Sequence, residues 1–349
     1  MNHNTPLSPR PLSHLAETHR RVLTTAQLRA HGVSAAETNE QCRAGGPWQQ
    51  YLPGVFLLHP GPPTSEERLH AVLMYAARGP APKAAPGVPA QPTAQRPHRP
   101  VPTDVMITGL AALTLHGFAA APALPALEKI DVLVPRLRRL RSAGSARIRR
   151  TAELPVPEVV TGLPVAPVPR ALADAVAGLR DAATVQRLLT EAVRGGHCEP
   201  AAVVRELNEA RLLNRPHVVD AVDSLLAEGR AIAEDRLYRM VAEHGLPDPV
   251  WNVDLRLPGG PHLGGLDAYW PGEAVALELD TRAPRQNDDA LWTEYARKRE
   301  LLERLGITVV HVTPRKLRDA PEQQATVVRT ALMAAADRDP AVYVVVLPR

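Results

Sequence analysis

Three carboxylates lie close together in the last third of the sequence, and their spacing is typical of a metal site. In residues 274–281, Glu278 and Asp280 share one face of an expected strand, while aliphatic side chains share the other. Asp267 lies in the preceding apolar segment, and a hairpin turn at residues 271–272 would place it beside them. Clustered carboxylates repel one another unless a cation neutralises them, and Mg²⁺ prefers oxygen ligands. The pattern predicts a Mg²⁺ site able to activate water for phosphodiester hydrolysis. The alternative is a set of ordinary solvent-facing acids on a half-exposed sheet.

The segments around these acids predict one α/β unit with a mixed sheet over residues 229–349. Helices are expected at residues 231–244, 289–305 and 322–336. Strands are expected at residues 250–257, 263–270, 274–281, 307–313 and 343–347.

The same region resembles a known nuclease family through three of its motifs. These are LDAYWP followed by AVALELD, the preceding helix AIAEDRLYRMV and the following basic segment EYARKRELLERLGITVVHVTP. Residues 229–318 are similar to the very-short-patch repair nucleases of the PD-(D/E)xK superfamily.

The resemblance implies a restriction-endonuclease-like fold with a catalytic centre. It implies that Asp267 and Glu278 hold the metal, that the helix acid is Glu234, and that basic residues of the following helix face the site. Those basic residues are among Arg297, Lys298 and Arg299. Asp280 stands where the superfamily usually has lysine. A nuclease fold retained for binding DNA or protein is the alternative.

Charge is distributed unevenly along the 349 residues. Residues 1–150 hold 18 Lys and Arg against 8 Asp and Glu, although the net charge of the whole chain is only +4. A polyanion is the natural partner of such a basic segment, and a solvated surface is the alternative.

Composition and motifs exclude several other classes. The apolar runs are far shorter than the roughly 20 residues that span a bilayer, so we expect no membrane partner and a cytoplasmic location. The two cysteines, Cys42 and Cys198, form no CxxC motif, which argues against a zinc site. No P-loop, GxGxxG, GxSxG or HExxH motif occurs.

The front of the chain has the pattern of a winged helix. Residues 24–27 and 34–37 both fit the capping box that begins a helix, and they lie about ten residues apart. Apolar segments then flank the Pro53-Gly54 turn as in a hairpin. Residues 80–102 contain eight prolines and few bulky apolar side chains, which predicts a disordered linker.

The run LTTAQLRAHGVSAAETNEQCRAGGPWQQYLPGVFLLHPG, with the later segments ITGLAALTLHGF, DVLVP and LPVAPVPRALADA, resembles the AbiEi antitoxins of type IV toxin–antitoxin systems. The resemblance implies that the winged helix binds promoter DNA, and that a nucleotidyltransferase toxin is the protein partner.

Two groups of residues are candidates for binding double-stranded DNA. In the expected recognition helix, residues 34–44, the candidates are Asn39, Gln41 and Arg43, with Arg29 on the preceding helix as a backbone contact. This helix also carries two acids, so a winged helix used for protein contacts is the alternative. The second group is a basic run expected to form a β-ribbon along the phosphate backbone, with a solvated loop as the alternative. Its members are Arg136, Arg138, Arg139, Arg141, Arg147, Arg149 and Arg150.

We therefore expect an α+β, multidomain protein. The expected parts are a winged helix at residues 12–78, the linker at 79–103, a mixed α/β middle region at 104–228 and an endonuclease-like domain at 229–349. The first functional hypothesis is a DNA-binding regulator of antitoxin type. The second is a Mg²⁺-dependent DNA endonuclease, and the third is a binding module that neutralises a partner through its rear domain.

Overall fold

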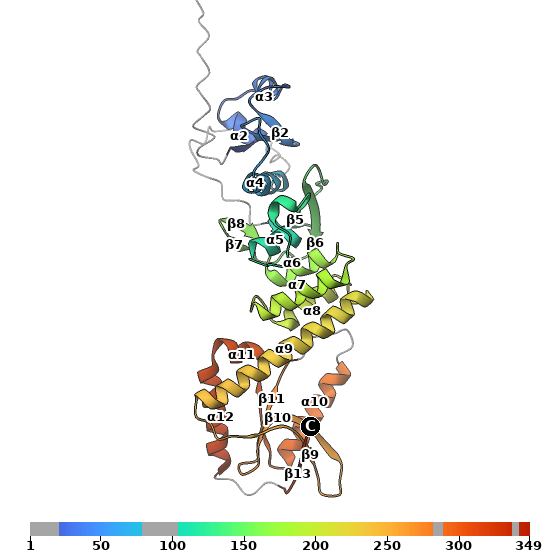
Figure 1. Cartoon of the computed structure of the whole chain (residues 1–349), viewed down its shortest axis with the longest axis vertical. Helices are drawn as coiled ribbons and strands as arrows, with labels where there is room; N and C mark the ends of the chain where they lie inside the picture. Colours follow the sequence, from blue (N-terminus) through green and yellow to red (C-terminus); the bar gives the residue numbers. More distant parts are fainter. Residues whose placement is uncertain (1–20, 79–103, 282–288, 337–341) are drawn as a thin grey trace, which may run out of the picture. The chain divides into compact units, whose positions relative to one another are not determined.

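The computed structural model describes residues 21–78, 104–281, 289–336 and 342–349, and it shows an α+β protein (Figure 1). The chain divides into two compact units, Met1–Gly178 and Leu179–Arg349, which we call unit 1 and unit 2. The expected linker at residues 79–103 lies outside the described residues, as do residues 12–20 of the expected winged helix. Among the described helices, none is both long and apolar enough to cross a bilayer.

Unit 1 begins with two short helices and a hairpin. Its first elements are β1 (Val22–Thr24), α2 (Thr25–Ala30), α3 (Ala35–Gln41), β2 (Gln49–Leu52), β3 (Val55–Leu57) and α4 (Ser65–Ala76). The strands form an antiparallel sheet in the order β1-β3-β2. Leu23, Leu28, Val33, Trp48 and Phe56 form the core of this part.

Both predicted capping boxes are present. Thr24 begins α2 by accepting a hydrogen bond from the Gln27 amide at 3.3 Å, and Gln27 accepts one from the Thr24 amide at 2.9 Å. Ser34 and Glu37 exchange the same two bonds at the start of α3, at 3.1 and 2.7 Å. The bond from the Ser34 amide lowers the pKa of Glu37. These local contacts fix where each helix begins, as the sequence predicts.

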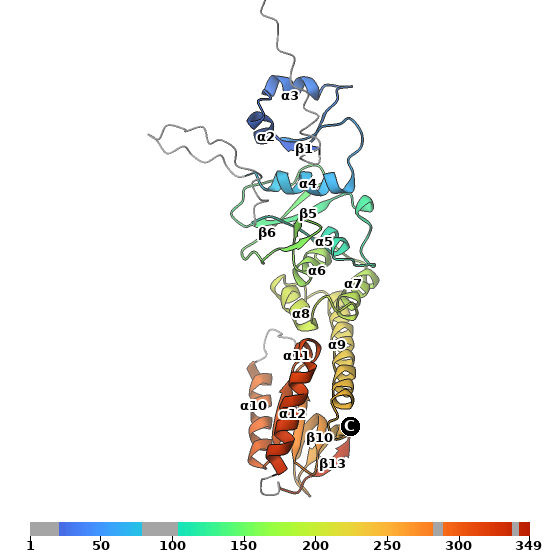
Figure 2. The same cartoon turned by 90° about the vertical axis from the view of Figure 1, so that its left-hand side faces the viewer.

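A second sheet follows α4 in unit 1. Its elements are β4 (Met106–Thr108), α5 (Gly109–Leu115), the 3₁₀ turn η1 (Leu124–Ala126), β5 (Ile130–Pro135), β6 (Ala146–Thr151), β7 (Glu158–Val160), β8 (Leu163–Val165) and α6 (Val168–Val176). The strand order is β6-β5-β4-β8-β7. Figure 2 shows α4 beside this sheet, and α4 contacts both β5 and the strands of the first sheet.

The basic run does not form the expected β-ribbon. β6 pairs with β5 in parallel, from Ile130 opposite Ala146 to Pro135 opposite Thr151. Residues 136–145 must therefore run back from the end of β5 to the level of its first residue. A two-stranded hairpin would instead make β5 and β6 antiparallel. A tight turn with Ala143 and Ala146 bridged is all that remains of the expected ribbon.

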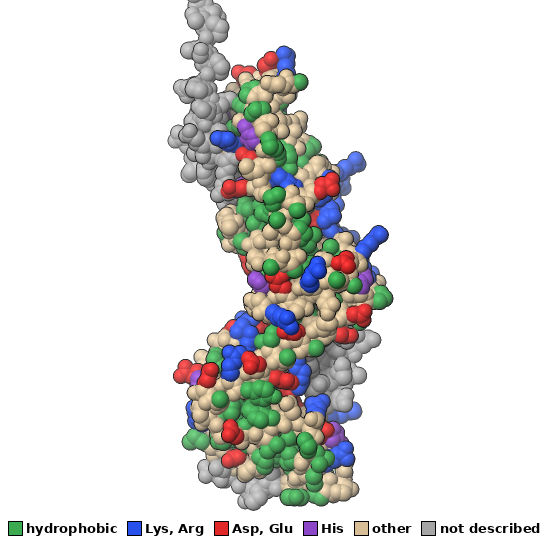
Figure 3. All heavy atoms as spheres, viewed as in Figure 1, with side chains coloured by type: hydrophobic (Ala, Val, Ile, Leu, Met, Phe, Trp, Pro, Cys, Tyr) green, Lys and Arg blue, Asp and Glu red, His purple; other side chains and the backbone are tan. Residues whose placement is uncertain are grey.

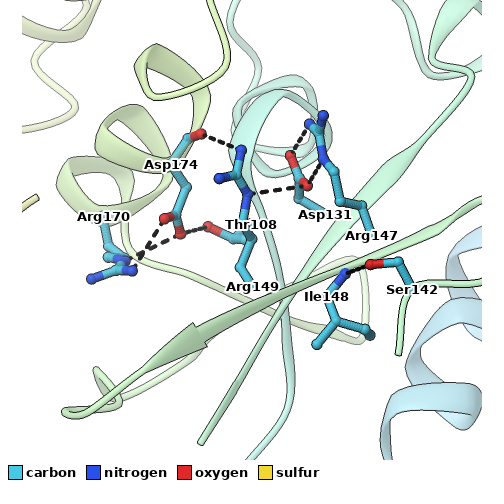
Figure 4. Close-up of polar contacts among 8 residues, drawn as sticks. All are labelled: Thr108, Asp131, Ser142, Arg147, Ile148, Arg149, Arg170 and Asp174. Carbon is cyan, nitrogen blue, oxygen red and sulfur yellow. Dashed lines mark hydrogen bonds and ion pairs between the residues drawn. The ribbon is translucent and has the colours of Figure 1, made fainter. Parts of the chain in front are cut away.

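Two arginines of β6 bind a buried acid of the neighbouring strand. Asp131 on β5 is almost fully buried, and Arg147 donates to both of its oxygens, at 2.5 Å to Oδ2 (Figure 4). Arg149 donates to Asp131 at 3.4 Å and to the backbone oxygen of Asp174 at 3.3 Å. The hydrogen bonds with Asp131 raise the pKa of Arg147. Arg170 and Thr108 hold the Asp174 carboxylate, so this network ties β4, β5, β6 and α6 together.

Unit 2 contains a mixed sheet and a long helix. Its elements are α7 (Ala182–Arg194), α8 (Pro200–Glu209), α9 (Pro216–Glu243), β9 (Val250–Arg256), β10 (His262–Trp270), β11 (Val275–Leu279), α10 (Asp289–Arg304), β12 (Thr308–Val312), α11 (Pro314–Asp319), α12 (Pro321–Ala336) and β13 (Val345–Pro348). The strand order is β12-β11-β10-β9-β13, with β11 and β12 parallel and the other pairs antiparallel.

Helices cover both faces of this sheet. One core contains Trp270, Leu277 and Val312 of the sheet with side chains of α9 and α12. The other contains Leu255, Ala276 and the α10 side chain Leu302. Figure 1 shows β10 and β11 between α12 and α10. The predicted alternation of β11 is therefore present, with Leu277 and Ala276 in different cores.

The boundary expected between residues 228 and 229 differs from the structure. α9 runs without a break from Pro216 to Glu243, so its predicted start at residue 231 is also too late. α7 and α8 pack against α9, which joins residues 179–228 to unit 2. Residues 104–178 belong to unit 1 instead.

The Asp131 network makes a testable contribution to unit 1. Asp131→Asn removes the charge that Arg147 and Arg149 share while keeping the side chain's shape. We expect a loss of about 2 kcal/mol, because bonds between charged groups contribute roughly 1.5–3 kcal/mol and Arg147 is partly screened by water.

Hydrogen–deuterium exchange of peptides covering β5 and β6 measures this loss in the full chain. Arg139→Ala, at an exposed arginine of the same run, is the matched control and should change protection little. Equal protection in Asp131→Asn and the wild type would contradict this role.

Candidate functional site

A cavity of about 420 Å³ opens in unit 2 where α9, α10 and three strands meet. Charged side chains line much of it. They are Arg230, Asp267, Glu278, Asp280, Lys298 and Arg349, and the histidines His262 and His311 join them. The structure thus brings together the three acids that the sequence singled out, along with Lys298.

Asp267 bridges two strands where their backbone pairing stops. The paired positions of β10 and β11 run from Trp270–Val275 to Ala268–Leu277. At the next position, Asp267 Oδ2 accepts a hydrogen bond from the Leu279 amide at 2.6 Å. Its other oxygen, Oδ1, pairs with Arg230 Nη2 of α9 at 2.6 Å. The side chain is only 10% exposed, so these contacts compensate for burying its charge.

Glu278 lies beside Asp267 in the cavity and has two basic neighbours. Lys298 Nζ of α10 donates to Glu278 Oε1 and to the backbone oxygen of Gly265, the latter at 2.6 Å. His311 Nδ1 of β12 lies 3.5 Å from Glu278 Oε2. Lys298 thus places an ammonium group of α10 beside the Glu278 carboxylate.

Two consecutive glycines make room for two cations, Gly264 for Lys298 and Gly265 for Arg349. The β9–β10 register shifts between His262 and Gly264, and Gly264 has a φ of +119°, which favours glycine. A Cβ at Gly264 would lie 2.5 Å from Lys298 Cε. A Cβ at Gly265 would lie 2.6 Å from Arg349 Nη1. The bulge therefore makes room for two cations at the cavity wall.

The remaining expected site residues divide between the cavity and the surface. Glu234 pairs with Arg230 at 2.8 Å on α9, and Asp280 lines the cavity. Arg297 is exposed on α10, and Arg299 is paired with Glu303 on the same helix. Of the three basic residues expected to face the site, Lys298 is the one that lines the cavity.

Several cavity residues were not singled out from the sequence. Arg230 lies one helical turn before Glu234, a spacing that could have indicated an ion pair. The Gly264-Gly265 pair inside a strand could have indicated a bulge. Nothing local in the sequence marks His311 on β12 or Arg349 after β13, because both strands join the sheet through long connections.

Asp267 and Glu278 are the carboxylates that would hold a Mg²⁺ ion keeping part of its water shell. Within the described residues, no three acids, histidines or cysteines are grouped closely enough to hold a metal alone. Mg²⁺ commonly binds through one or two carboxylates together with waters and phosphate oxygens. Asp267 and Glu278 provide two such carboxylates in one cavity, so water and a phosphate would complete the set.

The candidate DNA-binding residues of α2 and α3 are mostly at the surface of unit 1. Arg29 and Asn39 are exposed, and Gln41 is half-buried. Arg43 is paired with Glu40 at 2.8 Å, so its charge is already balanced. On the side of each unit that Figure 3 shows, basic and acidic side chains are interspersed, and the basic ones form no continuous band.

Four members of the basic run are tied to unit 1 itself. Besides Arg147 and Arg149, Arg138 donates to Asp104 at 2.5 Å and Arg150 to the backbone oxygen of Arg138 at 3.1 Å. The other three members are exposed. They are Arg136, Arg139 and Arg141. The run is therefore partly a structural element, which its composition alone does not reveal.

Comparisons with known proteins add no family to this description. None of the protein-family models matches the chain, and the search of curated proteins also found no match.

The role of the glycine bulge predicts a specific destabilisation. Gly264→Ala introduces a Cβ against the Lys298 stem at a backbone conformation that L side chains rarely adopt. We expect a loss of about 2 kcal/mol, because such strain costs roughly 1–3 kcal/mol. Gly272→Ala is the control, since its Cβ would have no atom within 4 Å.

Urea denaturation of the full chain in a double-mutant cycle separates the two causes. In a Lys298→Ala background, Gly264→Ala should cost less, because the contact with the lysine is gone. An equal cost in both backgrounds would show that Lys298 does not depend on the bulge.

Proposed function

We propose that unit 2 is a Mg²⁺-dependent endonuclease that hydrolyses phosphodiester bonds in DNA. The observation that carries this proposal is the convergence of Asp267, Glu278 and Lys298 in one cavity. The order helix, three antiparallel strands, helix and parallel strand, from α9 to β12, supports it, because this order places the acids on neighbouring strands and the lysine on the covering helix.

The residues divide into ligands and cations. Asp267 and Glu278 would hold the metal, with Asp280 and Glu234 as further acids near it. Bound Mg²⁺ supplies a Lewis acid and lowers the pKa of its water. Lys298, fixed by the Gly265 carbonyl and Glu278, presents an ammonium group that offsets the negative charge of a phosphate in the cavity.

The substrate is proposed from charge and from the resemblance to repair nucleases. Arg230, Lys298 and Arg349 line the same cavity, and guanidinium and ammonium groups are the usual partners of phosphate. The basic excess of residues 1–150 favours a polyanionic partner for the whole chain.

Removing the carboxylates tests the endonuclease proposal. With Mg²⁺ or Mn²⁺, we expect the wild type to cleave supercoiled plasmid and short duplexes. Asp267→Ala and Glu278→Ala should each lower the cleavage rate by at least about 100-fold, since charged groups that stabilise a transition state typically contribute that much.

Asp248→Asn, at an exposed acid outside the cavity, is the control and should cleave like the wild type. Cleavage that persists unchanged in both alanine variants would show that any nuclease activity comes from elsewhere. No cleavage by the wild type would leave unit 2 as a binding scaffold.

A second candidate function is DNA binding by unit 1 as a regulator of antitoxin type. The observation that favours it is the arrangement of α2, α3 and the β2–β3 hairpin, with Arg29 and Asn39 exposed. Under this proposal the domain is a winged helix, and the AbiEi resemblance adds a nucleotidyltransferase toxin as protein partner. Glu37 and Glu40 on α3 oppose phosphate contacts, so the affinity should be modest.

Two substitutions on α3 test this second candidate. Asn39→Ala should weaken binding to a DNA duplex taken from the region upstream of the protein's own gene. Fluorescence anisotropy measures this binding. Glu40→Gln should strengthen it about threefold, because it frees Arg43 and a surface charge pair contributes roughly 0.2–1 kcal/mol.

Affinity should fall steeply with salt in every variant. Glu322→Gln, at an exposed acid of unit 2, controls for the change in net charge. An affinity that does not change with salt concentration, or that falls in Glu40→Gln, would contradict DNA recognition by α3.

A further inference from the structure

Arg230 holds Asp267, which lines the cavity, and Glu234 of its own helix with one guanidinium group. Its Nη2 lies 2.6 Å from Asp267 Oδ1, and its Nε lies 2.8 Å from Glu234 Oε1. Asp267 belongs to β10, while Glu234 follows Arg230 by one turn of α9. A single positive charge thus sits between two carboxylates that come from different elements.

This is also where a divalent cation would have to bind. The Leu279 amide donates to Asp267 Oδ2 and Arg230 pairs with Oδ1, so both oxygens already have a partner, and a metal ion that takes Oδ1 must displace Arg230. A guanidinium and a divalent ion within a few ångströms of one oxygen repel each other strongly in a partly buried site. Only one of the two cations can therefore neutralise Asp267 at a time.

The two cations that pair with Asp267 and Glu278 differ in their freedom to move. Lys298 is 18% exposed, its stem passes over Gly264, and its ammonium is held by Gly265 and Glu278. Arg230 is 40% exposed, and it lines the cavity from a continuous helix. Rotation of its side chain needs no backbone movement, so Arg230 is the cation that can leave.

We infer that Arg230 is a resident counter-ion that a divalent cation displaces from Asp267 and Glu234, and that the released guanidinium then contacts a phosphate in the cavity. This inference rests on the proposed function for the identity of the incoming ion. In the absence of nucleic acid, Arg230 competes with the metal for Asp267 and lowers the affinity for metal. Once displaced, the same side chain adds a cation for the substrate, so metal and phosphate should bind cooperatively.

Mn²⁺ binding to the full chain without nucleic acid tests this inference. Binding is measured by electron paramagnetic resonance of free Mn²⁺ and by isothermal titration calorimetry. Arg230→Gln should raise Mn²⁺ affinity at least tenfold, because the metal no longer competes with a resident charge. It should also lower the melting temperature of the metal-free chain, and Mn²⁺ should restore it.

Matched variants keep the result interpretable. Arg239→Gln removes an arginine of the same helix that pairs with Asp235 at i,i+4 and 2.6 Å, away from the cavity, and should leave Mn²⁺ affinity unchanged. Arg230→Lys keeps one charge but cannot hold both acids with a fork, so its affinity should be intermediate. This variant also serves if Arg230→Gln does not fold. Adding Asp267→Asn to Arg230→Gln should abolish the gain.

The outcomes separate this inference from the proposed function. Mn²⁺ affinity that is equal or weaker in Arg230→Gln overturns the inference, and so does the absence of Mn²⁺ binding in every variant. If the wild type cleaves DNA while Arg230→Gln shows no gain in affinity, the endonuclease proposal stands alone. If Arg230→Gln gains affinity but no variant cleaves, the exchange of cations stands and the endonuclease proposal fails.

Discussion

Each unit of this chain buries an acid on a β-strand, and the local architecture depends on the cations that lie against it. A buried carboxylate is strongly unfavourable unless charge and hydrogen bonds compensate for the lost water. Asp131 pairs with Arg147, 16 residues away in the sequence, and Asp267 pairs with Arg230, 37 residues away. These ion pairs add to the backbone pairing of β5 with β6 in unit 1 and to the apolar packing of α9 on the sheet in unit 2.

The two ion-pair networks differ in what surrounds them. Around Asp131, both arginines come from a neighbouring strand, and the network continues to Asp174 inside unit 1. Around Asp267, a second acid, a lysine and a cavity lie beside the pair. The first arrangement stabilises a fold, whereas the second leaves charged groups facing a space that a ligand can enter. The conspicuous basic run is thus partly a structural element, and the less conspicuous acids form the candidate site.

Short-range features were predictable from the sequence, and long-range partners were not. The capping boxes at Thr24 and Ser34 and the alternation around Glu278 depend on residues a few positions apart. The parallel pairing of β5 with β6 depends on residues that are farther apart, and it changes the role of Arg147 and Arg149. Likewise, Gly264 makes room for Lys298, a residue of a distant helix. The spacing of residues in the sequence does not give the position of that helix relative to the strand.

We propose that the cation at Asp267 is exchangeable and that the exchange prepares the cavity for a phosphodiester. A crystal structure of the full chain with Mn²⁺ and a short DNA duplex, using anomalous scattering to locate the metal, tests it most directly. The account predicts an anomalous peak at Asp267 and Glu278, with Arg230 turned from Asp267 toward a phosphate. The contrary result is a cavity without metal, with Arg230 still paired to Asp267, at Mn²⁺ concentrations that saturate binding in solution. It would contradict the proposed exchange.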